Sequence, residues 1–157
     1  MKFLGNALFQ LLSDDRRYWK TMVDSPDTIP AVVEEVLRFS TPVLSTYRQT
    51  TQDVELDGKS IPKGAILRVL LTSANRDETV FSDAETFDPE REKANRHATF
   101  GYGVHFCIGA PLARLETHIA LEQLSQRLPS LRLAPDQEIE YSTNLILRSV
   151  DRLLIEW

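Results

Sequence analysis

The sequence contains only one cysteine, Cys107, which excludes a disulfide framework within the chain. A lone thiol is either a small buried apolar residue or a reactive or metal-binding group. Positive charge is also scarce, because 18 Lys and Arg residues stand against 23 Asp and Glu residues and the formal net charge is -5. This balance argues against nucleic acid as a partner, since phosphate binding needs clustered Lys and Arg.

Long apolar runs are missing too. No stretch of the sequence approaches the length of a membrane span, so we expect no membrane partner. Residues 1–12 resemble a short signal peptide, but Asn6 and Gln10 interrupt the apolar run and no small-x-small cleavage site follows. Leucines instead recur at helical spacing, at Leu4, Leu8, Leu11 and Leu12. We therefore predict a helix at this end and a cytoplasmic protein.

Helical signals continue as far as Pro42. Residues 13–15 offer caps for a second helix around residues 16–23, and Thr28 offers a cap for a third. That third helix carries one apolar stripe, formed by Val32, Val33, Val36 and Leu37.

Strand signals replace helical ones over residues 45–71, where Asp57 and Gly58 form the dipeptide of a tight hairpin turn. Residues 72–99 are polar and irregular, with Phe81 and Phe87 as expected anchors.

A long helix is expected to begin near Pro111, and the tail from residue 131 contains short strand-like runs. We expect this helix to carry five apolar residues inward: Leu112, Leu115, Ile119, Leu124 and Leu128. These signals predict a mainly α fold with small β-sheets, an α+β class, in one domain covering residues 1–157.

The densest chemical information lies in residues 100–111, where glycines surround Cys107 just ahead of a predicted helix. Glycine permits tight backbone turns, and the N-terminus of a helix favours negative charge through its free N–H groups and its dipole. The free N–H groups and the dipole both favour the thiolate, the form that binds metals. We expect Phe100, Phe106 and Ile108 to keep water away from the sulfur.

Three interpretations of this segment compete on residue chemistry alone. The first is a buried structural cysteine. The second is a zinc site built from His97, His105, Cys107 and His118, although these spacings lack a pair of closely spaced ligands. The third is ligation of heme iron by a thiolate, which needs one cysteine, apolar surroundings and N–H groups near the sulfur.

The pattern Phe100-x-x-Gly103-x-His105-x-Cys107-x-Gly109 resembles the heme-binding loop of the cytochrome P450 family, in the form with histidine two residues before cysteine that bacterial members often carry. Residues 110–116 continue the resemblance. It implies that Cys107 is the axial ligand of heme b iron, that His105 hydrogen-bonds a heme propionate and that Phe100 packs beside the proximal face. It also places Gly101, Gly109 and Ala113 at the cofactor.

Further residues follow the same family order. Glu35 and Arg38 match its Glu-x-x-Arg element, and Arg91 lies where an arginine completes a buried Glu-Arg-Arg triad. We expect this triad to fix the loop that leads to Cys107. The alternative is a solvated helix pair, Glu35 with Arg38 or Glu34 with Arg38.

Arg48 occupies a position from which bacterial members reach a heme propionate, the alternative being an exposed strand arginine. Four nearby residues fall where the family lines its substrate pocket, although a role in the core is equally compatible with them: Pro42, Val43, Leu44 and Thr46.

The resemblance runs from about residue 3 to residue 157 and implies the C-terminal portion of the P450 fold, without the N-terminal helices and most of the distal helix. Because the acid and alcohol side chains that direct protons to oxygen belong to that distal helix, we expect no catalytic residue in this chain. We also expect apolar faces that would pack on the missing helices to be exposed.

Two functions are compatible with this resemblance. The first is a heme-thiolate monooxygenase that inserts one atom of O₂ into a small organic substrate, with electrons from a ferredoxin or flavodoxin, and with Arg114 near the surface that meets this donor. The second is a truncated heme-binding module, or an inactive fragment, without turnover on its own. A separate N-terminal half is a further expected partner in either case.

Overall fold

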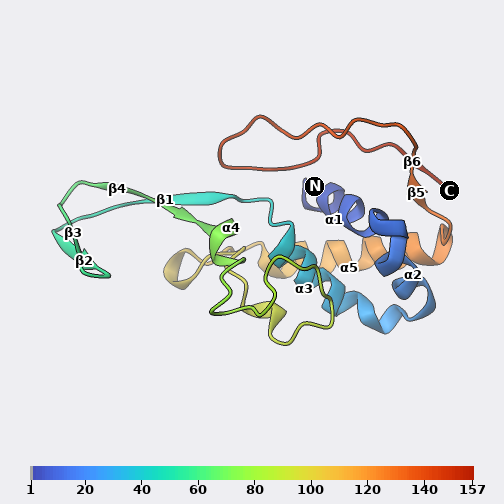
Figure 1. Ribbon diagram of the computed structural model, residues 1–157, viewed down its shortest axis with the longest axis horizontal. Coiled ribbons are helices and arrows are strands. Elements are labelled where there is room, and N and C mark those ends of the chain that lie inside the picture. Colours follow the sequence, from blue (N-terminus) through green and yellow to red (C-terminus); the bar gives the residue numbers. More distant parts are fainter. Residues whose placement is uncertain (1) are drawn as a thin grey trace.

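The computed structural model describes residues 2–157, with most of the helices gathered at one end and a long β-ribbon extending from them (Figure 1). The α-helices are α1 (Lys2–Leu12), α2 (Arg17–Asp24), α3 (Ile29–Phe39), α4 (Leu71–Ala74) and α5 (Ala110–Arg127). The strands are β1 (Ser45–Gln49), β2 (Val54–Leu56), β3 (Lys59–Ile61), β4 (Ile66–Leu70), β5 (Arg132–Leu133) and β6 (Ile155–Glu156). Short 3₁₀ helices are η1 (Asp14–Arg16), η2 (Pro26–Thr28), η3 (Ala94–Arg96) and η4 (Gly103–His105).

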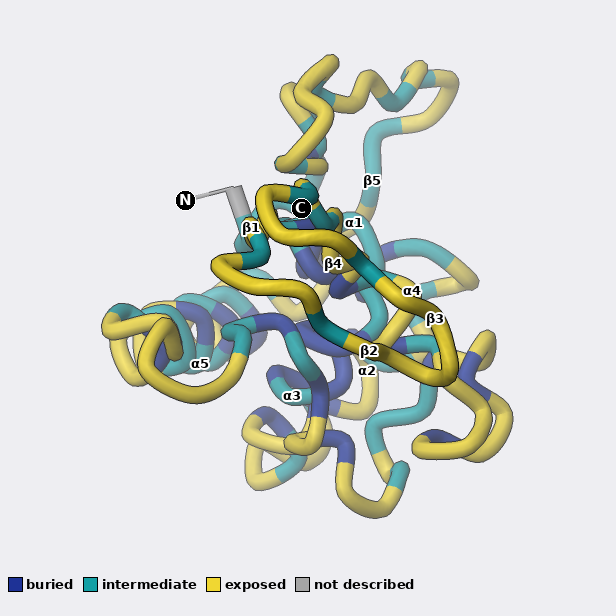
Figure 2. Tube along the Cα trace, turned by 90° about the vertical axis from the view of Figure 1, so that its left-hand side faces the viewer, coloured by how far each residue is buried: buried dark blue, intermediate teal, exposed yellow. Residues whose placement is uncertain are grey.

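Helix α3 lies at the centre of the core. Its predicted apolar stripe is confirmed, because every member is at least 98% buried. Trp19 and Met22 of α2, Leu121 of α5 and Leu131 pack into the same cluster and are fully buried. Figure 2 shows the buried part of the trace concentrated around α3, whereas the β2–β3 hairpin is largely exposed. The core therefore lies among the helices and not in the sheets.

The predicted helix caps are wrong. The Ser13 hydroxyl donates to Phe9 O at 2.6 Å and the Thr28 hydroxyl to Ser25 O at 2.7 Å, so both bind carbonyls that precede them. Thr28 is already helical, with φ -77° and ψ -17°, because η2 leads directly into α3. Helix α2 begins only at Arg17, since residues 14–16 all have positive φ.

The predicted hairpin is confirmed. Asp57 and Gly58 have φ of 50° and 70°, as a two-residue turn between β2 and β3 requires. Strands β1 and β4 pair antiparallel, and Leu71, which was expected to continue the strand, starts α4 instead. The irregular segment that follows is anchored as expected, with Phe81 and Phe87 buried.

Asn6 connects α1 to the C-terminal tail. Its Nδ2 donates to Arg148 O at 2.9 Å, and its Oδ1 accepts from Val150 N at 2.9 Å. The polar residue that interrupts the apolar run of α1 therefore holds the tail, which runs out and back beside this helix (Figure 1).

Helix α5 buries a different face from the one predicted. Its buried residues are Ala110, Thr117, Leu121 and Ser125, and Leu124 and Leu128 are partly buried against the core. Leu112, Leu115 and Ile119 were expected to point inward, but they are 57%, 56% and 47% exposed. At 3.6 residues per turn these three lie opposite Leu121, on a side where no described residue covers them. Apolar residues on opposite faces are typical of a helix that is buried on both faces.

The predicted fold class is confirmed as mainly α with small antiparallel sheets. Over residues 2–157, no helix combines the length and the apolar character needed to cross a membrane. The single domain and the cytoplasmic location stay predictions.

The two faces of α5 predict unequal effects of the same substitution. We expect Leu121→Ala to lower the free energy of unfolding by about 2–5 kcal/mol, because it leaves a cavity in the core. Leu112→Ala on the exposed face should change it by less than about 0.5 kcal/mol. Urea unfolding of the two variants measures both values, and equal losses would contradict this assignment of faces.

Candidate functional site

The segment that carries Cys107 is a tight loop between the irregular region and α5. Cys107 N donates to Phe100 O at 2.9 Å, and Ala110 N donates to Cys107 O at 3.1 Å, so the loop is closed at both ends. Gly101 has φ of 70°, a conformation that residues with a side chain rarely adopt. A Cβ at Gly109 would lie 3.8 Å from the Cys107 sulfur. The glycines therefore allow the backbone to turn close to the thiol.

The sulfur is less shielded than expected. Cys107 is exposed, Phe106 is 51% exposed and Ile108 is fully exposed. The prediction that Phe106 and Ile108 keep water from the sulfur is wrong for the described chain, because the loop projects beyond the helices and no neighbour covers these side chains. Phe100 alone of the three is partly buried, packed against the core.

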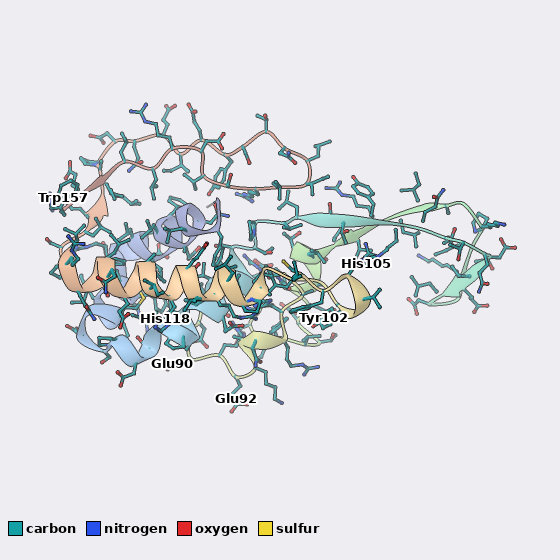
Figure 3. The ribbon with its side chains drawn as sticks, turned by 180° about the vertical axis from the view of Figure 1, so that it is seen from behind. Glu90, Glu92, Tyr102, His105, His118 and Trp157 are labelled. Atoms are coloured by element: carbon teal, nitrogen blue, oxygen red, sulfur yellow. The ribbon has the colours of Figure 1, made fainter. Side chains whose placement is uncertain are left out.

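A cavity of about 420 Å³ opens beside this loop. It is lined by six of the seven predicted cofactor-binding residues: Arg48, Phe100, Gly101, His105, Cys107 and Ala113. Gly109 does not line it and lies next to the sulfur instead. Figure 3 shows His105 at the loop, on the side of the molecule toward the β-ribbon. The structure thus brings together residues from β1, the loop and α5, while their individual roles stay predictions.

The rest of the lining is mainly apolar, with Phe3, Leu37 and Leu71 among its members. Pro42, Val43 and Thr46 of the predicted substrate pocket line the same cavity. Leu44 does not. It lines a separate cavity of about 370 Å³ between α1 and the tail.

Arg48 supplies positive charge at this cavity. Its Nη1 donates to Thr46 Oγ1 at 3.1 Å and to Tyr47 O at 2.8 Å. None of the ion pairs within residues 2–157 involves it. A thiol, apolar walls and a guanidinium that has no carboxylate partner in this part of the chain form a donor set that suits a flat apolar iron macrocycle with carboxylate groups.

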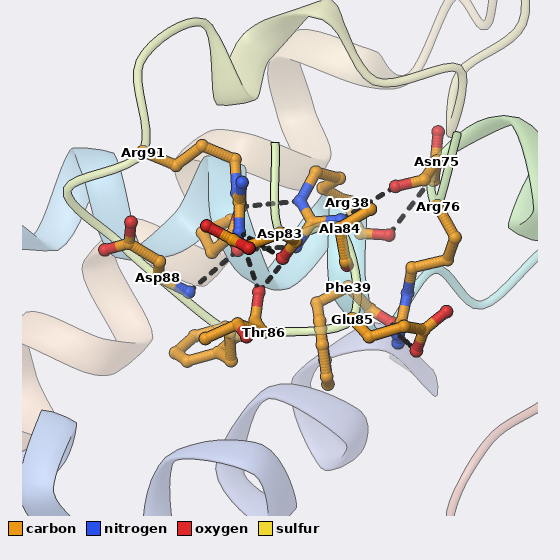
Figure 4. Close-up of polar contacts among 12 residues, drawn as sticks. Arg38, Phe39, Asn75, Arg76, Asp83, Ala84, Glu85, Thr86, Asp88 and Arg91 are labelled. Carbon is orange, nitrogen blue, oxygen red and sulfur yellow. Dashed lines mark hydrogen bonds and ion pairs between the residues drawn. The ribbon is translucent and has the colours of Figure 1, made fainter. Parts of the chain in front are cut away.

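The predicted triad is assembled. Arg38 Nε lies 2.8 Å from Glu35 Oε2 and its Nη2 lies 2.7 Å from Oε1, and both side chains are fully buried. Arg91 Nε lies 3.4 Å from Glu35 Oε1. Arg38 uses its remaining N–H groups on the carbonyls of Asn75, Ala84 and Thr86 (Figure 4). All five donors of the guanidinium are therefore satisfied, and the segment after α4 is tied to α3.

Asn75 extends this network toward the cysteine loop. Its Nδ2 donates to Thr99 Oγ1 at 2.9 Å, and its Oδ1 accepts from Ala98 N at 2.6 Å. Thr99 Oγ1 in turn donates to Leu37 O at 2.7 Å. No local pattern in the sequence marks Asn75 for this role, since asparagine is common in polar, irregular segments.

The surface interpretation of Glu34 and Arg38 is wrong, since Glu34 pairs with Arg114 at 2.5 Å and lies 3.3 Å from His97 Nε2. The Arg114 side chain remains 34% exposed, and its predicted place near the surface that meets the electron donor stays a prediction. The zinc interpretation finds no support either. No group of three or more His, Cys, Asp or Glu side chains in the described chain could share a metal ion.

Comparison with known proteins identifies the family. The cytochrome P450 family pattern matches residues 10–154, and the chain belongs to this family. Heme b is the cofactor of the family.

The chain is 42% identical over 150 residues to cytochrome P450 CYP107DY1 of Priestia megaterium, covering 96% of this chain and 36% of that protein. It is 40% identical over 136 residues to the erythromycin C-12 hydroxylase of Saccharopolyspora erythraea, covering 86% and 34%. The crystal structure of the Acinetobacter radioresistens CYP116B5 heme domain superposes with a TM-score of 0.95 at 42% identity, covering 99% of this chain and 37% of that one. The chain thus spans about a third of the length of these relatives.

Substitution at the triad predicts a large loss of stability. Glu35→Gln leaves the buried Arg38 charge without its counterion, and we expect the free energy of unfolding to fall by about 3–5 kcal/mol. The matched control is Glu85→Gln, which breaks an ion pair with Arg76 at a carboxylate that is 76% exposed and should cost less than about 1 kcal/mol. Urea unfolding compares them, and equal effects would contradict a buried network.

The acid stability of the chain should depend on Glu34. Burial alone raises the pKa of Glu34, but hydrogen bonds from His97 and Arg114 outweigh it and hold the pKa at about 2, below the ordinary 4.5. The carboxylate therefore contributes its full stability above pH 4.5 and loses it as the pH falls toward 2. We predict that the difference in unfolding free energy between the unmodified chain and Glu34→Gln shrinks across this window. If this difference stays constant in urea titrations at successive pH values, the lowered pKa of Glu34 is contradicted.

Proposed function

We propose that residues 1–157 form one partial domain that supplies the iron-ligand side of a heme-thiolate monooxygenase. The observation that carries this proposal is the single cavity that gathers the thiol of Cys107, the cation of Arg48 and the ring of Phe100. Family membership supports it, because the cofactor of the family is heme b. The whole reaction would insert one atom of O₂ into a small organic substrate.

Each residue has a distinct task in this proposal. Cys107 would hold the iron as a thiolate, helped by the dipole of α5, which begins three residues later. His105 and Arg48 would hydrogen-bond the propionates and thereby orient the macrocycle. Phe100 would pack against the macrocycle, and Gly101, Gly109 and Ala113 would leave room for its close approach. When bound, heme supplies the activation of oxygen.

The triad of Glu35, Arg38 and Arg91 contributes by holding the backbone that leads to this loop. The contacts from Arg38 to Asn75 and from Asn75 to Thr99 form a continuous path from the triad to the residue before Phe100. None of the described residues is assigned to proton delivery, so no residue of this chain is proposed as catalytic.

Two kinds of protein partner belong to this proposal. A ferredoxin or flavodoxin-type donor would supply electrons. A polypeptide that corresponds to the remaining two thirds of the relatives would cover the exposed face of α5 formed by Leu112, Leu115 and Ile119. Its helices would also exclude water from the cavity, which oxygen chemistry requires.

The second candidate function is a heme-binding module without turnover. The exposed sulfur of Cys107 and the cavity that opens beside it favour this role for the 157 residues alone. The two candidates differ in one measurement. Product formed from an organic substrate with a reduced ferredoxin and the chain alone would favour the monooxygenase, and heme uptake without product would favour the module.

Heme ligation by Cys107 is tested by absorption spectroscopy. We expect the chain loaded with hemin, reduced and exposed to carbon monoxide to give the Soret band of a thiolate–carbonyl complex. Cys107→Ala should abolish this band while heme uptake at the cavity persists. Val104→Ala is the matched control, because Val104 lies in the same loop but is 97% exposed and does not line the cavity. An imidazole-type band from the unmodified chain would overturn the assignment.

A further inference from the structure

Glu34 connects the two ends of the cysteine loop. It lies on α3, and its Oε1 and Oε2 accept hydrogen bonds from Nε and Nη2 of Arg114 at 2.5 and 2.9 Å. Its Oε2 also lies 3.3 Å from His97 Nε2. His97 precedes the loop and Arg114 follows it on α5, so a single carboxylate joins both flanks. Neither the triad nor the proposed ligand set uses these three side chains.

Within residues 2–157, Glu34 is the one charged group in contact with Nε2 of His97. The His97 side chain is 1% exposed, and its Nδ1 accepts from Thr99 N at 3.3 Å, so Nε2 is the ring nitrogen that can donate. The Nε2 contact with Glu34 departs from ideal hydrogen-bond geometry, yet no other acceptor satisfies this buried atom. Removing the carboxylate would therefore take away the ion-pair contact of this buried nitrogen.

Both partners of Glu34 pack on Phe100. The Arg114 guanidinium carbon lies 4.7 Å from the centroid of the Phe100 ring, and the His97 ring centroid lies 5.7 Å from it. Phe100 in turn accepts the backbone hydrogen bond from Cys107 N at 2.9 Å and lines the cavity. Contacts therefore run from Glu34 through two side chains to Phe100, and from Phe100 to the residue with the thiol.

We propose that Glu34 is a positioning residue for the thiol, holding Arg114 and His97 against Phe100 so that Cys107 keeps one orientation toward the cavity. This inference rests on the proposed function, since it concerns the same cysteine. It assigns to Glu34 a task separate from that of its neighbour Glu35, which ties down the segment after α4. An ion pair without this task would contribute stability alone and leave the state of the sulfur unchanged.

The test compares heme-loaded variants by the lifetime of their thiolate–carbonyl band. We expect Glu34→Gln to load hemin but to convert from the thiolate form to the non-thiolate form roughly tenfold faster than the unmodified chain, as expected for loss of a charge-assisted hydrogen bond. Arg114→Gln should do the same, and Arg114→Lys, which keeps the charge but not the two parallel bonds, should be intermediate.

The matched control is Glu92→Gln, which removes an exposed carboxylate remote from the cavity and should leave the lifetime unchanged. Should Glu34→Gln fail to fold by circular dichroism, the two Arg114 variants carry the test. Unchanged lifetimes in the folded Glu34 and Arg114 variants, beside a stable thiolate band in the unmodified chain, would overturn the positioning role alone. Absence of that band from the unmodified chain would instead overturn ligation by Cys107.

Discussion

The buried ion pair between Glu35 and Arg38 is the interaction on which the rest of the structure depends. Two opposite charges without solvent exposure are stable only when each remaining donor and acceptor is satisfied, and Arg38 meets this condition with three backbone carbonyls. Those carbonyls belong to a segment with little regular secondary structure. The pair therefore replaces a hydrogen-bonded sheet or helix as the means of fixing this part of the backbone.

Two adjacent glutamates on α3 divide the support of the cysteine loop. Successive residues of a helix point about 100° apart, so Glu35 faces the segment after α4 while Glu34 faces α5. Helix α3 thus fixes both the segment that precedes the loop and α5, which follows the loop. The loop itself contributes few contacts of its own, since most of residues 101–109 are exposed.

The sequence predicted those features that depend on residues close together in the chain. The Asp57–Gly58 turn and the fold class follow from backbone preferences and hydrophobic patterns, and both are confirmed. The glycine-rich segment around Cys107 likewise predicted a tight loop ahead of a helix. The family pattern located the members of the cavity, which come from distant parts of the chain.

Features that depend on what covers a surface could not be predicted in this way. The spacing of Leu112 and Leu115 marks an apolar face, but periodicity does not reveal whether a neighbour lies against it. The partner of Arg114 was missed for a related reason, because Glu34 lies eighty positions away and only the packing of α3 on α5 brings the two together. Leu44 shows the same limit at a smaller scale, since Val43 and Thr46 line the cavity beside Cys107 while Leu44 between them lines another.

The central claim is that the sulfur of Cys107 bonds the iron of heme. X-ray absorption at the iron edge, on the chain loaded with hemin, measures the atoms bound to iron directly. We predict one sulfur neighbour in the unmodified chain and none in Cys107→Ala. A first shell made only of nitrogen and oxygen in the unmodified chain would contradict it.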